Sequence, residues 1–263
     1  MKLGAFIDQF PLYFQYFLKQ ADEHSIQAPF AYTFYKDIIK DKRHEADPFY
    51  DLLKSHSKNS TPISKNQFGA GSKSTNSSKP ITLGQIIRSS ISPFKISALL
   101  VRIARFMEAA TIVELGTSAG INTLRLANFL PKSRIFTFEG NPDLIMFARK
   151  LLKDHNYRNV SIIEGDIDNT LAEFVRCGNV ADLIYIDANH QGTALKHYFN
   201  LLRNPTFSHQ IVVVDDIRWS SDMFKAWSEL CSRQEVRLSF DLGRLGILLF
   251  RDSLVKQHYI VRF

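Results

Sequence analysis

Five short apolar runs constrain this sequence most, because a long stretch separates each run from the next. The runs predict strands at 111–115, 134–139, 159–164, 182–187 and 210–215. Each is followed by ten or more residues of amphipathic, helix-like spacing. Alternating strands and helices imply right-handed crossovers and therefore a parallel sheet with helices on both faces. The sequence thus predicts a doubly wound α/β fold for the second half of the chain.

The end of the chain departs from this alternation. Two apolar runs, 236–242 and 245–251, are joined by Gly243-Arg244. A short glycine-containing connection between two apolar runs is typical of a β-hairpin. We therefore expect the parallel sheet to end in an antiparallel strand.

The first 109 residues have a different composition. Residues 5–53 show helical spacing with many aromatic side chains, and 28–40 reads as a helix with Pro29 near its start. The aromatic stripe of the first helix is interpreted as packing. Residues 54–80 are rich in serine and lysine and read as a loop, within which Phe68–Ser72 (FGAGS) stands out as an ordered clamp. We predict a helical extension at 1–109 that forms a lid or substrate wall, and a second domain at 110–263.

Charge and cysteine content narrow the class of protein. The net charge is +7, but five lysines lie in the acid-free 54–80 stretch, so a solvated loop explains much of it. Two cysteines are too few for a disulfide framework, and the sequence shows neither a bilayer-spanning run nor a signal peptide. We expect a cytoplasmic protein that does not insert into a membrane. Nucleic acid binding is not favoured, and a homodimer is compatible with the sequence.

The stretch TIVELGTSAG contains the most informative turn. The first strand ends before Gly116 and the next helix begins after Gly120, so backbone N–H groups face a ligand there. Ser118 stands where a dinucleotide-binding fingerprint has its middle glycine, and no lysine follows to complete a triphosphate-binding loop. Thr117 and Ser118 add hydroxyl donors. Glu114 would repel phosphate, but it would hold a cationic group or order the turn.

Acids end the next two strands. Glu139, followed by Gly140, is placed to accept both ribose hydroxyls of a nucleoside. Asp166, followed by Ile167, is placed to accept a hydrogen bond from an exocyclic amine such as that of adenine. The glycine turn and these acids together favour a nucleoside without phosphates.

The motifs VELGTSAG, FEGNP, EGDI and DLIYIDANH resemble, in this order, those of class I S-adenosylmethionine-dependent methyltransferases. The resemblance covers about 110–251 and implies a Rossmann-like, seven-stranded, mostly parallel sheet whose last strand is antiparallel. It also implies S-adenosylmethionine as cofactor. Its implied binding residues are Glu114, Gly116, Thr117, Ser118, Gly120, Glu139, Gly140, Asp166, Ile167 and Asp187.

DLIYIDANHQG and IVVVDDIRWS look most like the catechol and caffeoyl-CoA O-methyltransferases, and the chain is also similar to uncharacterised bacterial methyltransferase-like proteins. This resemblance implies a divalent cation, Mg²⁺ or another, held by Asp187, Asp215 and Asp216. Asp216 stands where those enzymes have Asn. His190 replaces their lysine base, and histidine also takes a proton near neutral pH. The catalytic residues implied are Asp187 and His190.

We therefore expect a methyltransferase that acts on a hydroxyl of a small-molecule acceptor. Two alternatives stay open. One is a methyltransferase of RNA or protein, favoured weakly by the basic 54–80 stretch. The other is an interaction module that binds the cofactor without catalysis.

Overall fold

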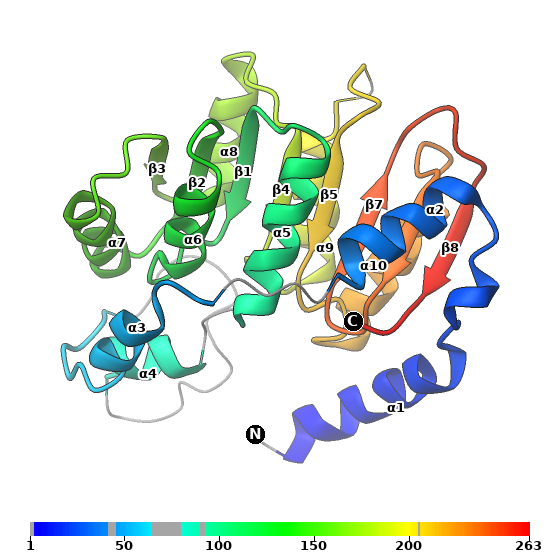
Figure 1. The fold of residues 1–263 in the computed structure, drawn as a ribbon. Coiled ribbons are helices and arrows are strands. Elements are labelled where there is room, and N and C mark those ends of the chain that lie inside the picture. Colours follow the sequence, from blue (N-terminus) through cyan, green and yellow to red (C-terminus); the bar gives the residue numbers. More distant parts are fainter. Residues whose placement is uncertain (1–2, 42–45, 65–79, 90–92, 205) are drawn as a thin grey trace. The chain divides into compact units, whose positions relative to one another are not determined.

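The computed structural model describes residues 3–41, 46–64, 80–89, 93–204 and 206–263, which Figure 1 draws as ribbon. The chain divides into two compact units. One, here called the central unit, comprises 42–179. The other, the two-segment unit, combines Met1–Asp41 with Val180–Phe263. The expected domain division at 109/110 stays a prediction.

The central unit contains three parallel strands in the order β3-β2-β1. Their bounds are β1 Thr111–Leu115, β2 Arg134–Glu139 and β3 Val160–Glu164. Six helices accompany them: α3 Tyr50–His56, α4 Leu83–Ser89, α5 Phe94–Phe106, α6 Ile121–Phe129, α7 Pro142–Asp154 and α8 Ile167–Arg176. Every residue of β1 is buried, Glu114 included, as expected for an interior strand of a parallel sheet. Since the strands are parallel, their carboxyl ends share one edge of the sheet.

The two-segment unit contains five strands in the order β4-β5-β7-β6-β8. Their bounds are β4 Leu183–Ile186, β5 Ile211–Val214, β6 Leu238–Asp241, β7 Gly246–Leu249 and β8 Gln257–Ile260. β4 and β5 are parallel, β7 is antiparallel to both β5 and β6, and β8 is parallel to β6.

The helices of this unit come from both ends of the chain, as their colours in Figure 1 show. They are α1 Leu3–Lys19, the 3₁₀ turn η1 Glu23–Ser25, α2 Pro29–Phe34, the π-helical turn η2 Tyr35–Ile39, α9 Gly192–Leu202 and α10 Ser221–Ser232. Among the helices of the described residues, none has both the length and the apolar character needed to cross a bilayer.

These strands confirm the predicted fold class, a mostly parallel sheet with an antiparallel end and added N-terminal helices. All five predicted parallel strands lie within one residue of their expected bounds, and the 236–251 hairpin is present. The described residues of the two units contain three and five strands, eight rather than seven, because β8 pairs with β6.

Two predictions for the N-terminal part need correction. Residues 54–56 belong to α3 and not to a loop, whereas the Phe68–Ser72 clamp lies outside the described residues. The aromatic stripe of α1 is largely exposed, with Phe10, Phe14 and Phe17 each more than half accessible. The packing role falls instead on Tyr16, which is buried and donates a hydrogen bond to the Val261 carbonyl.

Candidate active site

The turn after β1 depends on left-handed backbone. Gly116, Ser118 and Gly120 have φ angles of 99°, 49° and 76°, a region that favours glycine. A Cβ added to Gly120 would lie 2.7 Å from the Cβ of Ala148 in α7, so a side chain is excluded there. Ser118 adopts the same backbone region without being glycine. The structure therefore uses both predicted glycines to bring the start of α6 close to the end of β1.

A buried hydrogen-bond network lies beneath this turn. The Glu114 carboxylate accepts from the Asn122 amide at 2.7 Å, from the Thr123 hydroxyl at 2.5 Å and from the Thr137 hydroxyl at 2.7 Å. The Thr117 hydroxyl lies 2.6 Å from that of Thr137. Burial raises the pKa of Glu114, while these hydroxyl and amide donors lower it. Glu114 thus orders the turn, one of its two expected roles, and the Thr117 hydroxyl faces the interior.

The network continues to the N-terminal side of the central unit. The Ser97 hydroxyl donates to Asn122 at 2.6 Å and lies 3.3 Å from the Arg125 guanidinium. Arg125 in turn pairs with Asp47 at 2.5 Å. Since Arg125 is almost fully buried, this ion pair satisfies a charge that would otherwise be costly. The glycine turn is therefore supported by a chain of polar contacts that begins at Asp47.

Glu139 ends β2 beside the glycine turn, as the sequence predicts. Its carboxylate accepts three backbone hydrogen bonds, from Ser118 at 2.8 Å, Gly140 at 3.0 Å and Asn141 at 2.9 Å. Burial raises the pKa of Glu139, and the same three N–H groups lower it. An ionised carboxylate has about four acceptor positions, so Glu139 keeps capacity for a further donor such as a ribose hydroxyl.

Asp166 follows β3 and precedes α8. Its carboxylate accepts from the Asn169 amide at 3.0 Å, and it makes no side-chain cap to its own helix. The neighbouring Gly165, with a φ of 131°, donates its N–H to the Glu139 carbonyl at 3.0 Å. Ile167 is half-buried as the first residue of α8. The structure therefore brings the ends of β1, β2 and β3 together in the predicted way.

In the two-segment unit, three predicted residues form a compact cluster. One ligand-type atom from each of Asp187, His190 and Asp216 lies within 4.8 Å of the other two. The His190 Nε2 is 3.9 Å from Asp216 Oδ2, and the His190 ring packs on Trp219 with centroids 5.1 Å apart. All three cluster side chains are partly accessible. We call this set the acidic cluster.

Asp215 is adjacent in sequence but differs in its surroundings. Its carboxylate receives a bidentate contact from Arg244, at 2.7 Å from Nε and 2.8 Å from a terminal nitrogen. It also accepts from the Tyr185 hydroxyl and the Asp216 N–H, both at 2.7 Å. These four donors fill the acceptor positions of a carboxylate. Asp215 is also fully buried, so it does not join the acidic cluster as an open ligand.

The charges of this region are closely coupled. Burial and the Asp215 charge raise the pKa of Asp216, while Arg244 and His190 lower it. Burial lowers the pKa of Arg244, but the hydrogen bonds and charges of the two aspartates outweigh it and raise that pKa overall. Asp216 also has a φ of 51°, which points to a backbone held by its surroundings. Arg244 therefore stays charged and neutralises much of the aspartate pair.

Two residues of this arrangement were not found from the sequence. Tyr185 is buried within β4, and its hydroxyl lies between Asp215 and Asp187, 3.3 Å from the latter. A tyrosine within an aliphatic strand is the one available signal, because a buried hydroxyl needs a partner. Arg244 was recognised only as part of a turn, and its contacts depend on the hairpin returning to the end of β5.

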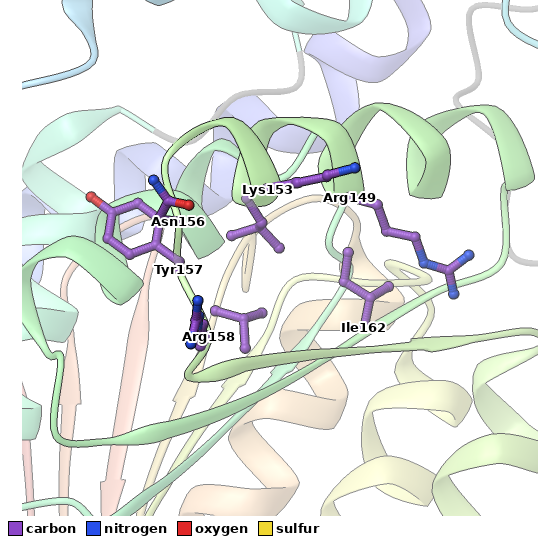
Figure 2. Close-up of a pocket in the computed structure, with 8 residues that line it drawn as sticks. Arg149, Lys153, Asn156, Tyr157, Arg158 and Ile162 are labelled. Atoms are coloured by element: carbon purple, nitrogen blue, oxygen red, sulfur yellow. The ribbon is translucent and has the colours of Figure 1, made fainter.

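A hollow in the central unit lies apart from the predicted cofactor residues. It has a volume of about 460 Å³ and is lined by Arg149 and Lys153 of α7 and by Tyr157 and Arg158 of the following loop. Figure 2 shows these side chains around the hollow. None of the predicted cofactor residues lines it. Its basic lining would suit an anionic group rather than a sulfonium cofactor.

Comparison with known proteins bears on the same segments. Residues 113–217 match the model of a family described as a methyltransferase domain. A protein-L-isoaspartate O-methyltransferase of Pyrococcus abyssi is 31% identical over 87 residues, which are 33% of this chain and 38% of that relative. The match therefore spans well under half of the curated relative. The predicted resemblance to class I methyltransferases is confirmed for this part of the chain.

Solved structures agree on the fold. An SAH-bound methyltransferase of Podospora anserina superposes with a TM-score of 0.53 at 22% identity, covering 62% of this chain and 80% of that one. A putative caffeoyl-CoA O-methyltransferase of Staphylococcus aureus gives 0.52 at 21% identity, with 61% and 84% covered. A SAM-bound O-methyltransferase of tomaymycin synthesis from Streptomyces achromogenes gives 0.52 at 20%, with 61% and 82% covered. Residues 113–217 thus match a methyltransferase-domain family model, and the chain shares the Rossmann-like fold of these structures.

Proposed function

We propose that this chain transfers a methyl group from S-adenosylmethionine to a hydroxyl of a small molecule. The observation that carries the proposal is the acidic cluster of Asp187, His190 and Asp216 at the carboxyl ends of β4 and β5. A histidine beside a carboxylate is suited to remove a hydroxyl proton near neutral pH.

The cofactor side of the proposal rests on the central unit. Glu139 would accept the ribose hydroxyls, because its carboxylate is held by backbone N–H groups and retains acceptor capacity. Asp166 would accept from the adenine amine, and the turn from Gly116 to Gly120 would receive the methionine part. Structures with the same fold were solved with SAH or SAM bound, which supports this choice of ligand.

The reaction needs few protein groups. The acceptor oxygen forms a bond to the methyl carbon while the carbon–sulfur bond breaks, and its proton passes to His190. The sulfonium charge disappears as S-adenosylhomocysteine leaves. The protein contributes mainly by orienting the acceptor and by supplying a base. Asp216, 3.9 Å from His190, would stabilise the imidazolium that forms.

The first helix supports an acceptor wall. Gln9 donates to the Trp219 carbonyl at 3.0 Å, and Arg218 donates to the Leu12 carbonyl at 3.1 Å, so α1 is tied to the loop after β5. Burial and the charge of Asp216 raise the pKa of Tyr13, which places this α1 residue in the field of the acidic cluster. We propose that Tyr13 and Trp219 line the site that the acceptor occupies.

The divalent cation implied by the resemblance does not fit its expected ligands. Of Asp187, Asp215 and Asp216, Asp215 is fully engaged by Arg244, Tyr185 and the Asp216 N–H. A metal at that set would have to displace a bidentate guanidinium. A metal at Asp187, Asp215 and Asp216 is therefore not part of the proposed reaction. Among the described residues, the ligand-type atoms close enough to share an ion are those of Asp187, His190 and Asp216, and the proposed reaction uses these side chains directly to activate the acceptor.

A second candidate is methylation of a protein or an RNA. The similarity to a protein-L-isoaspartate O-methyltransferase favours a protein acceptor, and the basic hollow of Figure 2 favours an anionic one. The hollow lies apart from the predicted cofactor residues, which makes this candidate weaker. The third reading, cofactor binding without catalysis, is supported by neither feature. We also propose a cytoplasmic location, because Cys177 and Cys231 are free thiols.

Transfer of a radiolabelled methyl group to a panel of catechols, phenols and aliphatic alcohols tests the proposal. We expect turnover with at least one acceptor, and a loss of about 10²–10⁴-fold in His190→Gln, the range for removal of a general base. SAH binding should be unchanged in that variant. Transfer to a protein or RNA fraction alone would replace the small-molecule proposal by the second candidate.

A further inference from the structure

We propose that Arg244 takes the place of a divalent cation in this site. The guanidinium bridges Asp215 and Asp216, with Nε 2.7 Å from Asp215 Oδ1 and 3.2 Å from Asp216 Oδ1. These are two of the three carboxylates that would otherwise ligate a metal. The role of Arg244 in methyl transfer rests on the proposed function. The metal-binding test does not depend on that function.

The bridging contact is built into the fold. Arg244 lies in the turn between β6 and β7, where Gly243 has a φ of 85° and donates its N–H to Asp241. The Arg244 carbonyl accepts from the Ile217 N–H at 3.0 Å, immediately after the aspartate pair. The backbone of the hairpin therefore fixes the arginine opposite Asp215 and Asp216, and the contact does not depend on the side chain alone.

The filled acceptor positions of Asp215 and the positive charge of Arg244 both support this role. Asp215 has its four acceptor positions filled, two of them by Arg244. A planar guanidinium matches a carboxylate better than a point charge does, and it neutralises the pair without an added ion. Its side chain remains 38% accessible, so the positive charge also faces the open side of the cluster. Arg244 is a positioning residue that holds Asp216 beside His190.

The proposal makes a prediction about metal binding rather than about loss of activity. Removal of the guanidinium frees oxygen atoms of Asp215 and Asp216, and three carboxylates are ligands that hard cations prefer. An arginine-to-methionine change should therefore create a divalent-cation site. The size of the gain should be about 10–100-fold in affinity, the range by which groups around a metal site alter binding.

Calorimetric titration with Mn²⁺ alone tests this on the full chain. We expect no saturable site in the wild type tighter than roughly 10⁻³ M, the weak end of oxygen-ligand sites. Arg244→Met should bind one Mn²⁺ about 10–100-fold more tightly, and Arg244→Met/Asp215→Asn should lose that gain. Arg244→Lys, which keeps the charge, should resemble the wild type.

Two results would overturn the proposal. One is a micromolar Mn²⁺ site in the wild type that disappears in Asp216→Asn, because a metal would then share the cluster with Arg244. The other is a folded Arg244→Met that binds Mn²⁺ no more tightly than the wild type. The wild-type titration decides even if the methionine variant does not fold. SAH titration of the same samples reports separately on the proposed function.

Discussion

At the scale of single residues, Glu139 and Glu164 are two glutamates at equivalent strand positions that can be compared directly. They are register partners at the ends of β2 and β3, yet their surroundings differ. Glu139 is buried and held by three N–H groups, whereas Glu164 is about half exposed and pairs with Arg149. Only Glu139 is placed beside the glycine turn through Ser118. The two positions therefore separate the proposed cofactor-binding carboxylate from a surface one.

We expect Glu139→Ala to weaken SAH binding. A hydrogen bond to a charged group contributes about 1.5–3 kcal/mol, so affinity should fall by roughly 10–100-fold. Glu164→Ala is the matched control and should bind SAH like the wild type. Calorimetry measures both, and equal affinities for the two variants would remove the ribose assignment.

The same carboxylate should make cofactor binding depend on pH. Burial raises the pKa of Glu139 above its ordinary value, and only the ionised form keeps an acceptor position for a ribose hydroxyl beside its three backbone N–H donors. SAH affinity should therefore be constant at alkaline pH and decline as the pH falls through the raised pKa. In Glu139→Gln, whose side chain does not titrate, the decline should be absent. A wild-type profile that stays flat from pH 8 down to the ordinary glutamate value of 4.5 would contradict this account.

At the scale of elements, the glycine turn and the C-terminal end of α8 offer a second matched pair. Gly120 and Gly178 have nearly the same φ, 76° and 79°. A Cβ at Gly120 would meet Ala148, whereas nothing lies within 4 Å of one at Gly178. The two glycines thus share a backbone requirement and differ in the space around them.

Alanine at these positions should separate strain from crowding. Gly178→Ala should lower the free energy of unfolding by about 1–2 kcal/mol, the cost of left-handed backbone. Gly120→Ala should cost about 1–3 kcal/mol more, because its methyl group also overpacks against α7. Urea denaturation of both variants measures the difference. Equal losses would mean that α6 and α7 are less closely packed than the structure indicates.

The attachment of α1 depends on one buried arginine. Arg218 pairs with Asp241 at 2.6 Å, and its guanidinium packs on the rings of Tyr16 and Phe224. Removal of one partner of a buried pair typically costs about 3–5 kcal/mol. We expect Arg218→Met to lose stability on this scale and to release α1 to proteolysis.

An exposed pair supplies the control for this variant. Arg176 pairs with Glu173 on α8, but both side chains are more than half accessible, and surface pairs contribute little. Arg176→Met should therefore unfold at nearly the wild-type urea concentration. If Arg218→Met did the same, the anchor role of the arginine would be wrong.

The elements also show what the sequence could reveal. β1 to β5 are short, largely apolar runs followed by amphipathic helices, and this local pattern was sufficient to predict them. β8 was missed because Gln257, His258 and Tyr259 carry no buried apolar pattern, and only pairing with β6 makes them a strand. Residues 54–56 have loop-like composition, but they complete the last turn of α3.

The candidate site likewise contains residues that the sequence could predict and residues that it could not. The positions of Gly116, Glu139 and Asp166 at the strand ends could be predicted because a strand end and a turn identify them locally, and their role in cofactor binding stays a prediction. The partners of Asp215 were not predicted, because Arg244 is 29 residues away along the chain and reaches Asp215 only through the hairpin. The metal-ligand expectation came from the resemblance to the catechol and caffeoyl-CoA O-methyltransferases, and a resemblance of motifs carries no information on which cation a carboxylate already holds.

At the scale of the whole molecule, the positive net charge makes RNA the main alternative to a small-molecule acceptor. The chain carries +7, and Arg149, Lys153 and Arg158 surround the hollow of Figure 2. Binding through phosphate contacts falls steeply with salt because counterions are released. We expect only weak association of a fluorescent single-stranded RNA, abolished by moderate salt and unaffected by SAH. Tight binding that strengthens with SAH would favour the RNA candidate.

The central claim is that the glycine turn and Glu139 bind the cofactor without help from a metal. Calorimetric titration with S-adenosylhomocysteine, in EDTA and then in Mg²⁺, tests it most directly. We expect one site per chain, with the same affinity in both buffers and a clear loss in Glu139→Ala. Absence of binding in either buffer would contradict the claim, and it would leave a methyltransferase fold that serves as an interaction module.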